Sequence, residues 1–133
     1  MIKLQVEQLA LCPRDPAKAR ELLESMGLRE WAEDIVVADG HVFDEKASNT
    51  ANLSFNYESD PMEKPMELEI LDYKSGRNWM EGRSGVSHIG MHCTKAELRE
   101  WMTFFKMRRI PVAQAVETQS HTNPNIAGKR TYK

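Results

Sequence analysis

The chain has 133 residues, of which 18 are lysine or arginine and 20 are aspartate or glutamate, so its net charge is −2 with neutral histidines. This balance excludes a general electrostatic attraction to nucleic acid or to an anionic membrane surface. The hydrophobic fraction of 41% and the charged fraction of 29% are typical of a folded single domain and exclude a disordered chain.

The sequence also indicates the cellular compartment. No apolar run approaches the roughly 20 residues of a membrane span, and the N-terminal residues lack the apolar core of a signal peptide. Two cysteines, Cys12 and Cys93, allow one disulfide but exclude a disulfide framework, and both are expected to be small buried hydrophobic residues. We therefore expect a cytoplasmic protein with no membrane and no nucleic-acid partner.

The first half of the chain predicts a strand, a helix and three further strands. Residues 2–12 alternate with a period near two, which is typical of a strand. Asp15 before Pro16 is a helix N-cap, and Gly27 is a typical residue after a helix end. Further strands are predicted over 31–43, 51–57 and 66–73, with loops over 44–50 and 58–65 and a turn or a bulge at Asp39-Gly40.

The second half repeats the start of this order. Residues 86–93 predict a strand, and Thr94 with Glu97 three residues later is a capping box that begins a helix ending near residue 108. The remaining expected elements are a strand over 111–117, a loop over 120–128 and a last strand from residue 130. The two halves correspond at an offset of about eighty residues, which indicates a duplicated unit.

The sequence therefore predicts an α+β fold in which paired βαβββ modules form a curved mixed sheet around a cleft. The expected single domain consists of a first module over 1–75, a linker over 76–85 and a second, shortened module over 86–133.

Three polar residues lie where these strands are expected to be buried: Gln8, Glu69 and His88. Burying such groups unpaired costs several kcal/mol, so each needs a partner. Gln8 and His88 occupy equivalent positions in the two modules, and strands that curl around one cleft would bring Glu69 to them. An amide oxygen, a carboxylate and an imidazole suit a divalent ion such as Zn²⁺, Ni²⁺, Co²⁺, Mn²⁺ or Fe²⁺.

Each of these residues also has a simpler interpretation. A single strand histidine is more often hydrogen-bonded to its neighbours than bound to metal, and Gln8 could face solvent. Glu67 and Glu69 point the same way, so they could line an exposed face. Only the shared geometry of the duplication favours the metal site over these alternatives.

Further residues are candidates for the wall of the same cleft. His92 lies on the expected face of His88, and either Glu67 or His92 is a candidate general base. Phe55, Tyr73 and Trp79 are candidate pocket residues, although core packing is the usual role of such side chains.

The residues at 6–11, 68–73 and 85–91 resemble the vicinal oxygen chelate superfamily, which includes glyoxalases, bleomycin-resistance proteins and dioxygenases. The resemblance implies that Gln8, Glu69 and His88 occupy three of the family's four metal positions. Glutamine at the first position is similar to some glyoxalase I enzymes, whereas ring-cleaving dioxygenases have histidine there. The fourth ligand of the family, a glutamate on the last strand, would fall beyond Lys133. The resemblance also implies a homodimer, because an open sheet edge pairs readily with another chain.

The leading functional hypothesis is a metal-dependent enzyme of the glyoxalase/dioxygenase type, such as a glyoxalase I-like lyase, acting on a small oxygenated molecule. One alternative is a metal-free protein of the same fold that binds a small, antibiotic-like molecule. The other alternative is a protein-interaction module without a small ligand.

Overall fold

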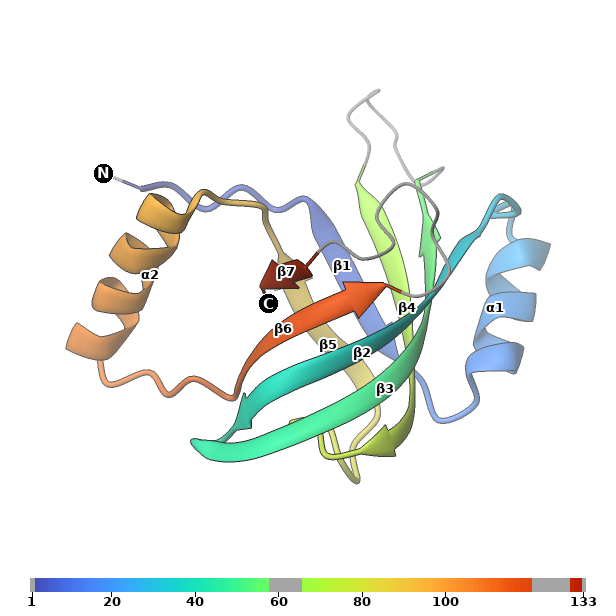
Figure 1. The fold of residues 1–133 in the computed structure, drawn as a ribbon. Coiled ribbons are helices and arrows are strands. Elements are labelled where there is room, and N and C mark those ends of the chain that lie inside the picture. The colour runs from blue at the N-terminus through green and yellow to red at the C-terminus, as the bar shows by residue number, and fades with distance from the viewer. Residues whose placement is uncertain (1, 58–65, 121–129, 133) are drawn as a thin grey trace.

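The computed structural model describes residues 2–57, 66–120 and 130–132. It consists of one curled sheet with a helix at either side (Figure 1). The strands are β1 (Gln8–Cys12), β2 (Ala32–Val42), β3 (Glu45–Asn56), β4 (Glu67–Gly76), β5 (Gly85–Gly90), β6 (Gln114–Ser120) and β7 (Arg130–Tyr132). The helices are α1 (Pro16–Ser25) and α2 (Lys95–Met107).

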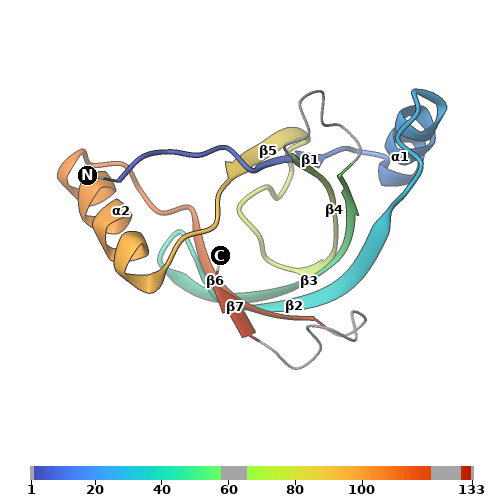
Figure 2. The same ribbon diagram turned by 90° about the horizontal axis from the view of Figure 1, so that it is seen from above.

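The sheet has the strand order β5-β1-β4-β3-β2-β6-β7. β1 and β4 are parallel, and all other neighbouring pairs in this order are antiparallel. Seen from above, the strands curl into a half-barrel whose concave side is the inner face of the sheet (Figure 2). The expectation of an α+β fold with a curved mixed sheet is therefore confirmed.

The first helix begins where the sequence predicts. The side chain of Asp15 accepts a hydrogen bond from the backbone N–H of Lys18 at 3.1 Å, and Pro16 is the first helical residue. After the helix, Gly27 adopts a φ of +104°, a left-handed conformation that glycine adopts without strain. α1 packs on the outer side of the sheet against β4.

Several boundaries differ from the sequence prediction. β1 begins only at Gln8, and residues 45–50 of the expected loop over 44–50 belong to β3. Asp39-Gly40 is neither a turn nor a bulge, because β2 pairs with β3 without a register shift through both residues. The hairpin turn lies instead at Phe43 and Asp44, which have φ values of 47° and 65°.

Gly40 has a different physical role from the expected turn. A Cβ atom at this position would lie 2.0 Å from the backbone oxygen of Ala115 on β6. The glycine therefore permits the close approach of two backbones in the β2–β6 pair, which is a common reason for glycine inside a strand.

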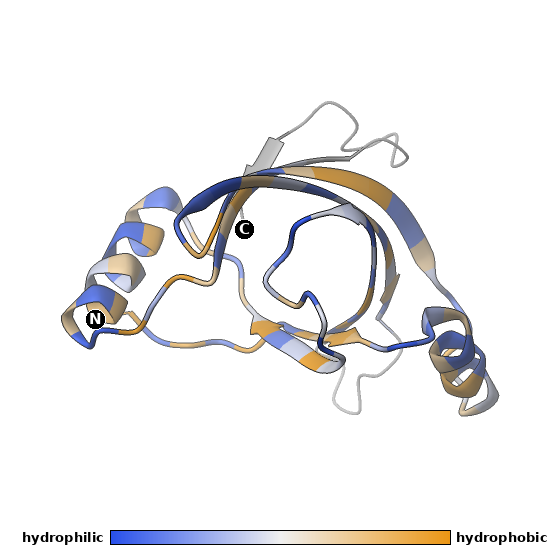
Figure 3. Ribbon diagram, turned by 90° about the horizontal axis from the view of Figure 1, so that it is seen from below, coloured by the Kyte–Doolittle hydropathy of each residue, from blue (hydrophilic) through white to orange (hydrophobic). Residues whose placement is uncertain are grey.

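A small apolar core lies on the inner face of the sheet. Its buried residues come from β1, β2, β3 and β4, and they are Ala10, Val36, Ala51, Leu53 and Leu71. Cys12, Phe55 and Tyr73 pack against this core from partly buried positions. The connection between β4 and β5 adds the buried side chains of Asn78 and Met80. Buried positions recur at every second residue along much of β2, as period-two burial requires, while hydropathy follows longer apolar and polar stretches along the curled strands (Figure 3).

After β5, the second half of the chain extends to the opposite edge of the sheet. β5 pairs with β1, whereas β6 crosses to the far edge of the sheet and pairs with β2. α2 stands away from the sheet (Figures 1 and 2), and within the described residues no strand packs against it as β4 packs against α1. Its aromatic residues contact each other instead, since the ring centroids of Trp101, Phe104 and Phe105 lie 5.6–5.7 Å apart.

The predicted ends of the chain are only partly described. The capping box at Thr94 and Glu97 is confirmed, because each side chain bonds the backbone N–H of the other residue. β6 runs over Gln114–Ser120 rather than 111–117, and the expected loop beyond it lies largely outside the described residues. A strand from residue 130 is confirmed as β7. No helix among the described residues is long and apolar enough to cross a membrane.

Removing the N-cap of α2 should destabilise this helix alone. The substitution Thr94→Ala deletes the oxygen that accepts from Glu97 N–H at 3.2 Å, which costs about 1 kcal/mol of helix stability. Because α2 is not packed on the sheet, amide hydrogen exchange in its first turn should accelerate roughly fivefold while the urea midpoint of global unfolding stays unchanged.

Thr103→Ala is the matched control, because the Thr103 hydroxyl bonds only the Arg99 carbonyl within the helix and should leave the first turn unaffected. A fall in the global unfolding midpoint for Thr94→Ala, but not for Thr103→Ala, would contradict the independence of α2.

Candidate functional site

The strand register brings the predicted polar residues to one face. Gln8 on β1 lies opposite Glu67 on β4 and opposite Gly90 on β5. Ala10, two residues later on β1, lies opposite Glu69 on β4 and opposite His88 on β5. Side chains of paired residues point to the same side of a sheet, so these residues all project from the inner face.

The structure brings together the three residues that the sequence singles out as metal ligands. The Gln8 amide donates from Nε2 to Glu69 Oε2 at 3.3 Å. Its oxygen, Oε1, lies 2.8 Å from His88 Nε2, and that same nitrogen lies 4.0 Å from Glu69 Oε1. The Glu69 side chain is 0% exposed and the His88 side chain is 38% exposed, so the cluster is closed at the carboxylate and open at the imidazole.

A small residue at position 10 makes this meeting possible. β4 and β5 flank β1 and are therefore separated by roughly 10 Å between backbones. Glu69 and His88 span this separation above Ala10, whose methyl group is fully buried. A larger side chain at this position would occupy the space in which the carboxylate and the imidazole approach each other.

Hydrogen bonds extend the cluster into a continuous polar chain. The Tyr57 hydroxyl donates to Glu67 Oε2 at 2.7 Å, and Glu67 Oε1 accepts from Gln8 Nε2. At the other end, Ser87 Oγ lies 3.0 Å from His88 Nδ1. We use the term polar chain for the six residues Tyr57, Glu67, Gln8, Glu69, His88 and Ser87.

The charge of the polar chain is concentrated in its two carboxylates. Burying an ionised carboxylate is costly unless donors or a cation compensate it, and Glu67 and Glu69 share one amide as a donor. Burial raises the pKa of Tyr57 to about 12, and the hydrogen bond and charge of Glu67 and the charge of Glu69 act in the same direction. The Tyr57 hydroxyl therefore keeps its proton at neutral pH and acts as a donor.

The expected aromatic pocket residues lie on or beside the inner face. Phe55 is opposite Glu69 in the β3–β4 register and packs against the core. Tyr73 also packs against the core. Its pKa is raised to about 12, chiefly by burial and further by the charges of Cys12 and Glu69. Trp79 lies in the β4–β5 connection, where its backbone N–H donates to Gln114 Oε1 at 3.2 Å.

His92 lies outside the polar chain. The alternation that predicts a shared face with His88 does not reach it, because β5 ends at Gly90. Its side chain is 91% exposed, and its Nδ1 lies 3.1 Å from Glu7 Oε2. The backbone N–H of His92 donates to the same oxygen at 2.6 Å, and this bond is the largest cause of the lowered pKa of Glu7.

The two cysteines are free and differ from each other. Cys12 is half-buried, and burial followed by the charge of Asp72 raises the pKa of its thiol, which disfavours the thiolate. Cys93 is exposed, so the expectation that both cysteines are buried is wrong for Cys93. The reason is that β5 ends before Cys93, which therefore lies in the segment leading to α2 rather than in the sheet.

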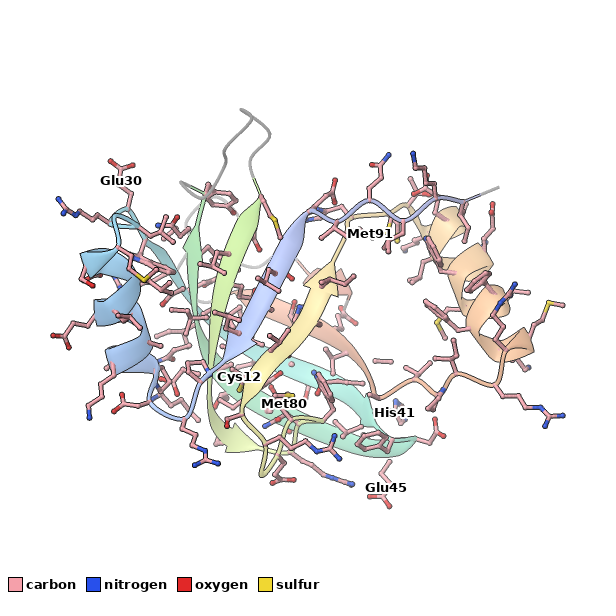
Figure 4. All side chains as sticks on the ribbon, turned by 180° about the vertical axis from the view of Figure 1, so that it is seen from behind. Cys12, Glu30, His41, Glu45, Met80 and Met91 are labelled. Carbon is pink, nitrogen blue, oxygen red and sulfur yellow. The ribbon has the colours of Figure 1, made fainter. Side chains whose placement is uncertain are left out.

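Two hollows lie apart from the polar chain. A hollow of about 460 Å³ lies between α1 and the outer face of the sheet, with Ile35, Ser54 and Ile70 among its lining residues. A second hollow of about 310 Å³ has Cys12, Tyr73 and Met80 among its lining residues, and Figure 4 shows Cys12 and Met80 near each other where β1 meets the β4–β5 connection. No residue of the polar chain lines either hollow.

His88 Nε2 lies close enough to Gln8 Oε1 and to Glu69 Oε1 to share a metal ion with each of them. Two ligand atoms that are each about 2.1 Å from one ion lie no more than about 4.2 Å apart. The distance from His88 Nε2 to Gln8 Oε1 is 2.8 Å and that to Glu69 Oε1 is 4.0 Å, so both pairs satisfy this limit. No group of three or more His, Cys, Asp or Glu side chains suited to a metal occurs in the described part of the chain, so this set depends on the amide oxygen.

Comparison with known proteins gave no match: no family model, no curated protein and no solved structure is significantly similar to this chain. The resemblance to the vicinal oxygen chelate superfamily therefore stays a prediction.

Sequence reasoning missed three residues that shape the site, Ala10, Ser87 and Gly90, and it considered Tyr57 only as a possible pocket wall, not as a hydrogen-bond donor to Glu67. Their contribution depends on the register between strands, which brings them to Gln8, Glu69 and His88. No local signal in the sequence points to these contacts, whereas the spacing of Glu67 two residues before Glu69 already predicts that both carboxylates share one face of β4.

The raised pKa of Tyr57 can be tested by ultraviolet titration of the phenols. In the wild-type protein, the ionisation of Tyr57 and Tyr73 should centre near pH 12, whereas free tyrosine ionises near pH 10. Glu67→Gln removes the carboxylate charge beside the Tyr57 hydroxyl, so the pKa of Tyr57 should fall towards the value set by burial. Tyr57→Phe identifies which step belongs to Tyr57, and a Glu67→Gln titration identical to wild type would contradict the contact.

Proposed function

We propose that this chain is a metal-dependent enzyme of the glyoxalase/dioxygenase type that acts on a small oxygenated molecule. Gln8 Oε1, a Glu69 carboxylate oxygen and His88 Nε2 would hold a divalent ion on the inner face of the sheet. The observation that carries this proposal is the convergence of these three side chains from β1, β4 and β5 above Ala10.

The donor set suits the chemistry of a borderline divalent ion. One carboxylate, one imidazole and one amide oxygen are compatible with Zn²⁺, Ni²⁺, Co²⁺, Mn²⁺ or Fe²⁺. When bound, such an ion supplies Lewis acidity to substrate oxygens at its open positions. The exposed side of His88 gives a small molecule access to these positions.

The neighbours of His88 support its role as a ligand. A ligating Nε2 carries no proton, so the ring proton must reside on Nδ1. Ser87 Oγ lies 3.0 Å from Nδ1 and can accept that proton in a hydrogen bond. Such an outer partner fixes both the tautomer and the ring orientation of a histidine ligand.

The order of elements in the first half supports the paired-module part of the proposal. β1, α1, β2, β3 and β4 give one strand-helix-three-strand unit with the spatial order β1-β4-β3-β2. β5 and α2 would begin the second module. Within the described residues β5 has no neighbour on its outer side, and an open edge of this kind is suited to pairing in a homodimer. A fourth metal ligand could then come from the partner subunit.

A second candidate is a metal-free protein that binds a small molecule. The hollow of about 310 Å³ beside Tyr73 favours it, because a concave surface with an aromatic side chain and polar groups can bind a small molecule without metal. Binding of this kind would raise the melting temperature in proportion to the logarithm of ligand concentration, without turnover.

Metal binding is the direct test of the proposed function. The purified protein is stripped with a chelator and titrated with Co²⁺, Ni²⁺ or Zn²⁺ by calorimetry, and metal content is measured after removal of unbound ion. We expect stoichiometric binding that His88→Ala weakens by more than the roughly 10–100-fold effect of losing an outer-shell partner.

His41→Ala is the matched control, because His41 is an exposed histidine on β2 and should not affect binding. Absence of binding by the wild-type protein after reconstitution, or equal binding by His88→Ala, would overturn the metal-dependent function.

A further inference from the structure

We propose that Tyr57 and Glu67 are positioning residues that orient the Gln8 amide, so that its oxygen rather than its nitrogen faces His88 at the metal position. This inference rests on the proposed function, because it concerns the same metal site. It assigns a role to two residues that hold no metal and extends the site from three strands to the end of β3.

The orientation of Gln8 is determined by what its nitrogen contacts. A side-chain amide has a donor end and an acceptor end of nearly equal size, and its neighbours determine which end points where. Gln8 Nε2 donates to Glu67 Oε1 and lies 3.3 Å from Glu69 Oε2. An ionised carboxylate only accepts hydrogen bonds, so a reversed amide would place its oxygen against two acceptors. The two glutamates therefore direct Gln8 Oε1 towards His88 Nε2, at 2.8 Å.

Tyr57 fixes Glu67 in turn. Its hydroxyl donates to Glu67 Oε2 at 2.7 Å, which leaves Oε1 directed at Gln8. Since the pKa of Tyr57 is raised to about 12, the hydroxyl remains a donor at any pH at which the protein would be assayed. The hydrogen bonds then have a single direction, from Tyr57 to Glu67 and from Gln8 to Glu67.

Gly90 provides the space that this orientation requires. A Cβ atom on Gly90 would lie 2.7 Å from Gln8 Oε1 and 3.1 Å from Gln8 Cβ. The contact of 2.7 Å is shorter than real Cβ atoms make and that of 3.1 Å is tight, so any side chain at position 90 would displace the amide oxygen. The glycine opposite Gln8 on β5 therefore serves the same purpose as the two glutamates on β4.

The same contacts argue against Glu67 as a general base. One of its oxygens accepts from Gln8 and the other from Tyr57, so a substrate proton would compete with both existing donors. His92, the other candidate base, is held by Glu7 away from the polar chain. Glu67 is therefore assigned to positioning.

The test compares two substitutions of one residue. Glu67→Gln keeps a carbonyl oxygen that can accept from Gln8, and its amide nitrogen can donate to the Tyr57 oxygen. Glu67→Leu has a similar size but accepts nothing. Glu81→Leu, at an exposed position of the β4–β5 connection, controls for replacing a glutamate by leucine. Circular dichroism and thermal melting establish that each variant is folded.

The first measurement is made without metal. In the ¹H–¹⁵N spectrum of the side-chain amides, the Gln8 signal is assigned by its loss in Gln8→Ala. We expect the Gln8 amide protons to be shifted downfield and slowly exchanging in wild type, Glu67→Gln and Glu81→Leu. In Glu67→Leu one of these protons should move upfield and exchange faster.

The second measurement is Co²⁺ affinity, followed by the visible absorption of the bound ion. Glu67→Leu should weaken binding by roughly 10–100-fold, as expected for an outer-shell partner, whereas Glu67→Gln should stay within about threefold of wild type. Tyr57→Phe, a half-exposed position that tolerates the change, should fall between them. Gly90→Ala should weaken binding without altering the charge of the site.

The outcomes separate this inference from the proposed function. If wild-type protein binds no Co²⁺, the metal-dependent function fails and this inference fails with it. If wild type binds Co²⁺ through His88 but Glu67→Leu and Glu67→Gln bind equally well, the positioning role is overturned while the proposed function stands. Loss of affinity in Glu67→Leu together with its rescue in Glu67→Gln supports both.

Discussion

The burial of the Glu69 carboxylate on the inner face of the sheet is the constraint on which the rest of the site depends. A buried acceptor that lacks a donor costs about 1–3 kcal/mol, and more when it is charged. Two successive inward-facing residues of β1 satisfy this constraint. Gln8 donates a hydrogen bond to the Glu69 carboxylate, and the small side chain of Ala10 leaves space for it. On the other side of β1, His88 of β5 places its Nε2 atom 4.0 Å from Glu69 Oε1. The hydrogen-bonded cluster and the proposed metal site use the same side chains. The contacts that compensate the buried carboxylate therefore also bring the proposed ligands together.

The candidate site could be predicted from sequence to the extent that it depends on alternation within strands. Polar residues at inward positions of otherwise apolar strands identified Gln8, Glu69 and His88, and the structure brings them within hydrogen-bond or ion-pair distance. The contacts of Tyr57 could not be predicted, because they require the register of β3 on β4 and the position of a residue just beyond the strand. His92 shows the limit of the same rule, since alternation ends where the strand ends.

The fold could be predicted where neighbouring residues carry a strong signal, as at the helix starts. It was less predictable where the pairing of distant strands determines the structure. Asp15 and Thr94 mark helix starts by their own hydrogen bonds, which need no tertiary context. Asp39-Gly40 has the composition of a turn, but the glycine is required by the nearby backbone of β6, which the sequence of β2 does not reveal. Likewise, nothing local to β6 indicates that it pairs with β2, so the separation of α2 from the sheet could not be foreseen.

Glutamine at position 8 combines a neutral ligand atom with a hydrogen-bond donor, a combination that neither histidine nor glutamate would reproduce here. With one carboxylate, one neutral imidazole and one neutral amide as ligands, a divalent ion at the proposed site retains net positive charge towards an oxygen of the substrate. A glutamate at position 8 would reduce that charge and would place three carboxylates together without the donor that Glu67 and Glu69 now share. A histidine could not donate to both glutamates while ligating through the same ring edge. The amide is the side chain that separates a donor end for the protein from an acceptor end for the ion, which is why its orientation matters more than its charge.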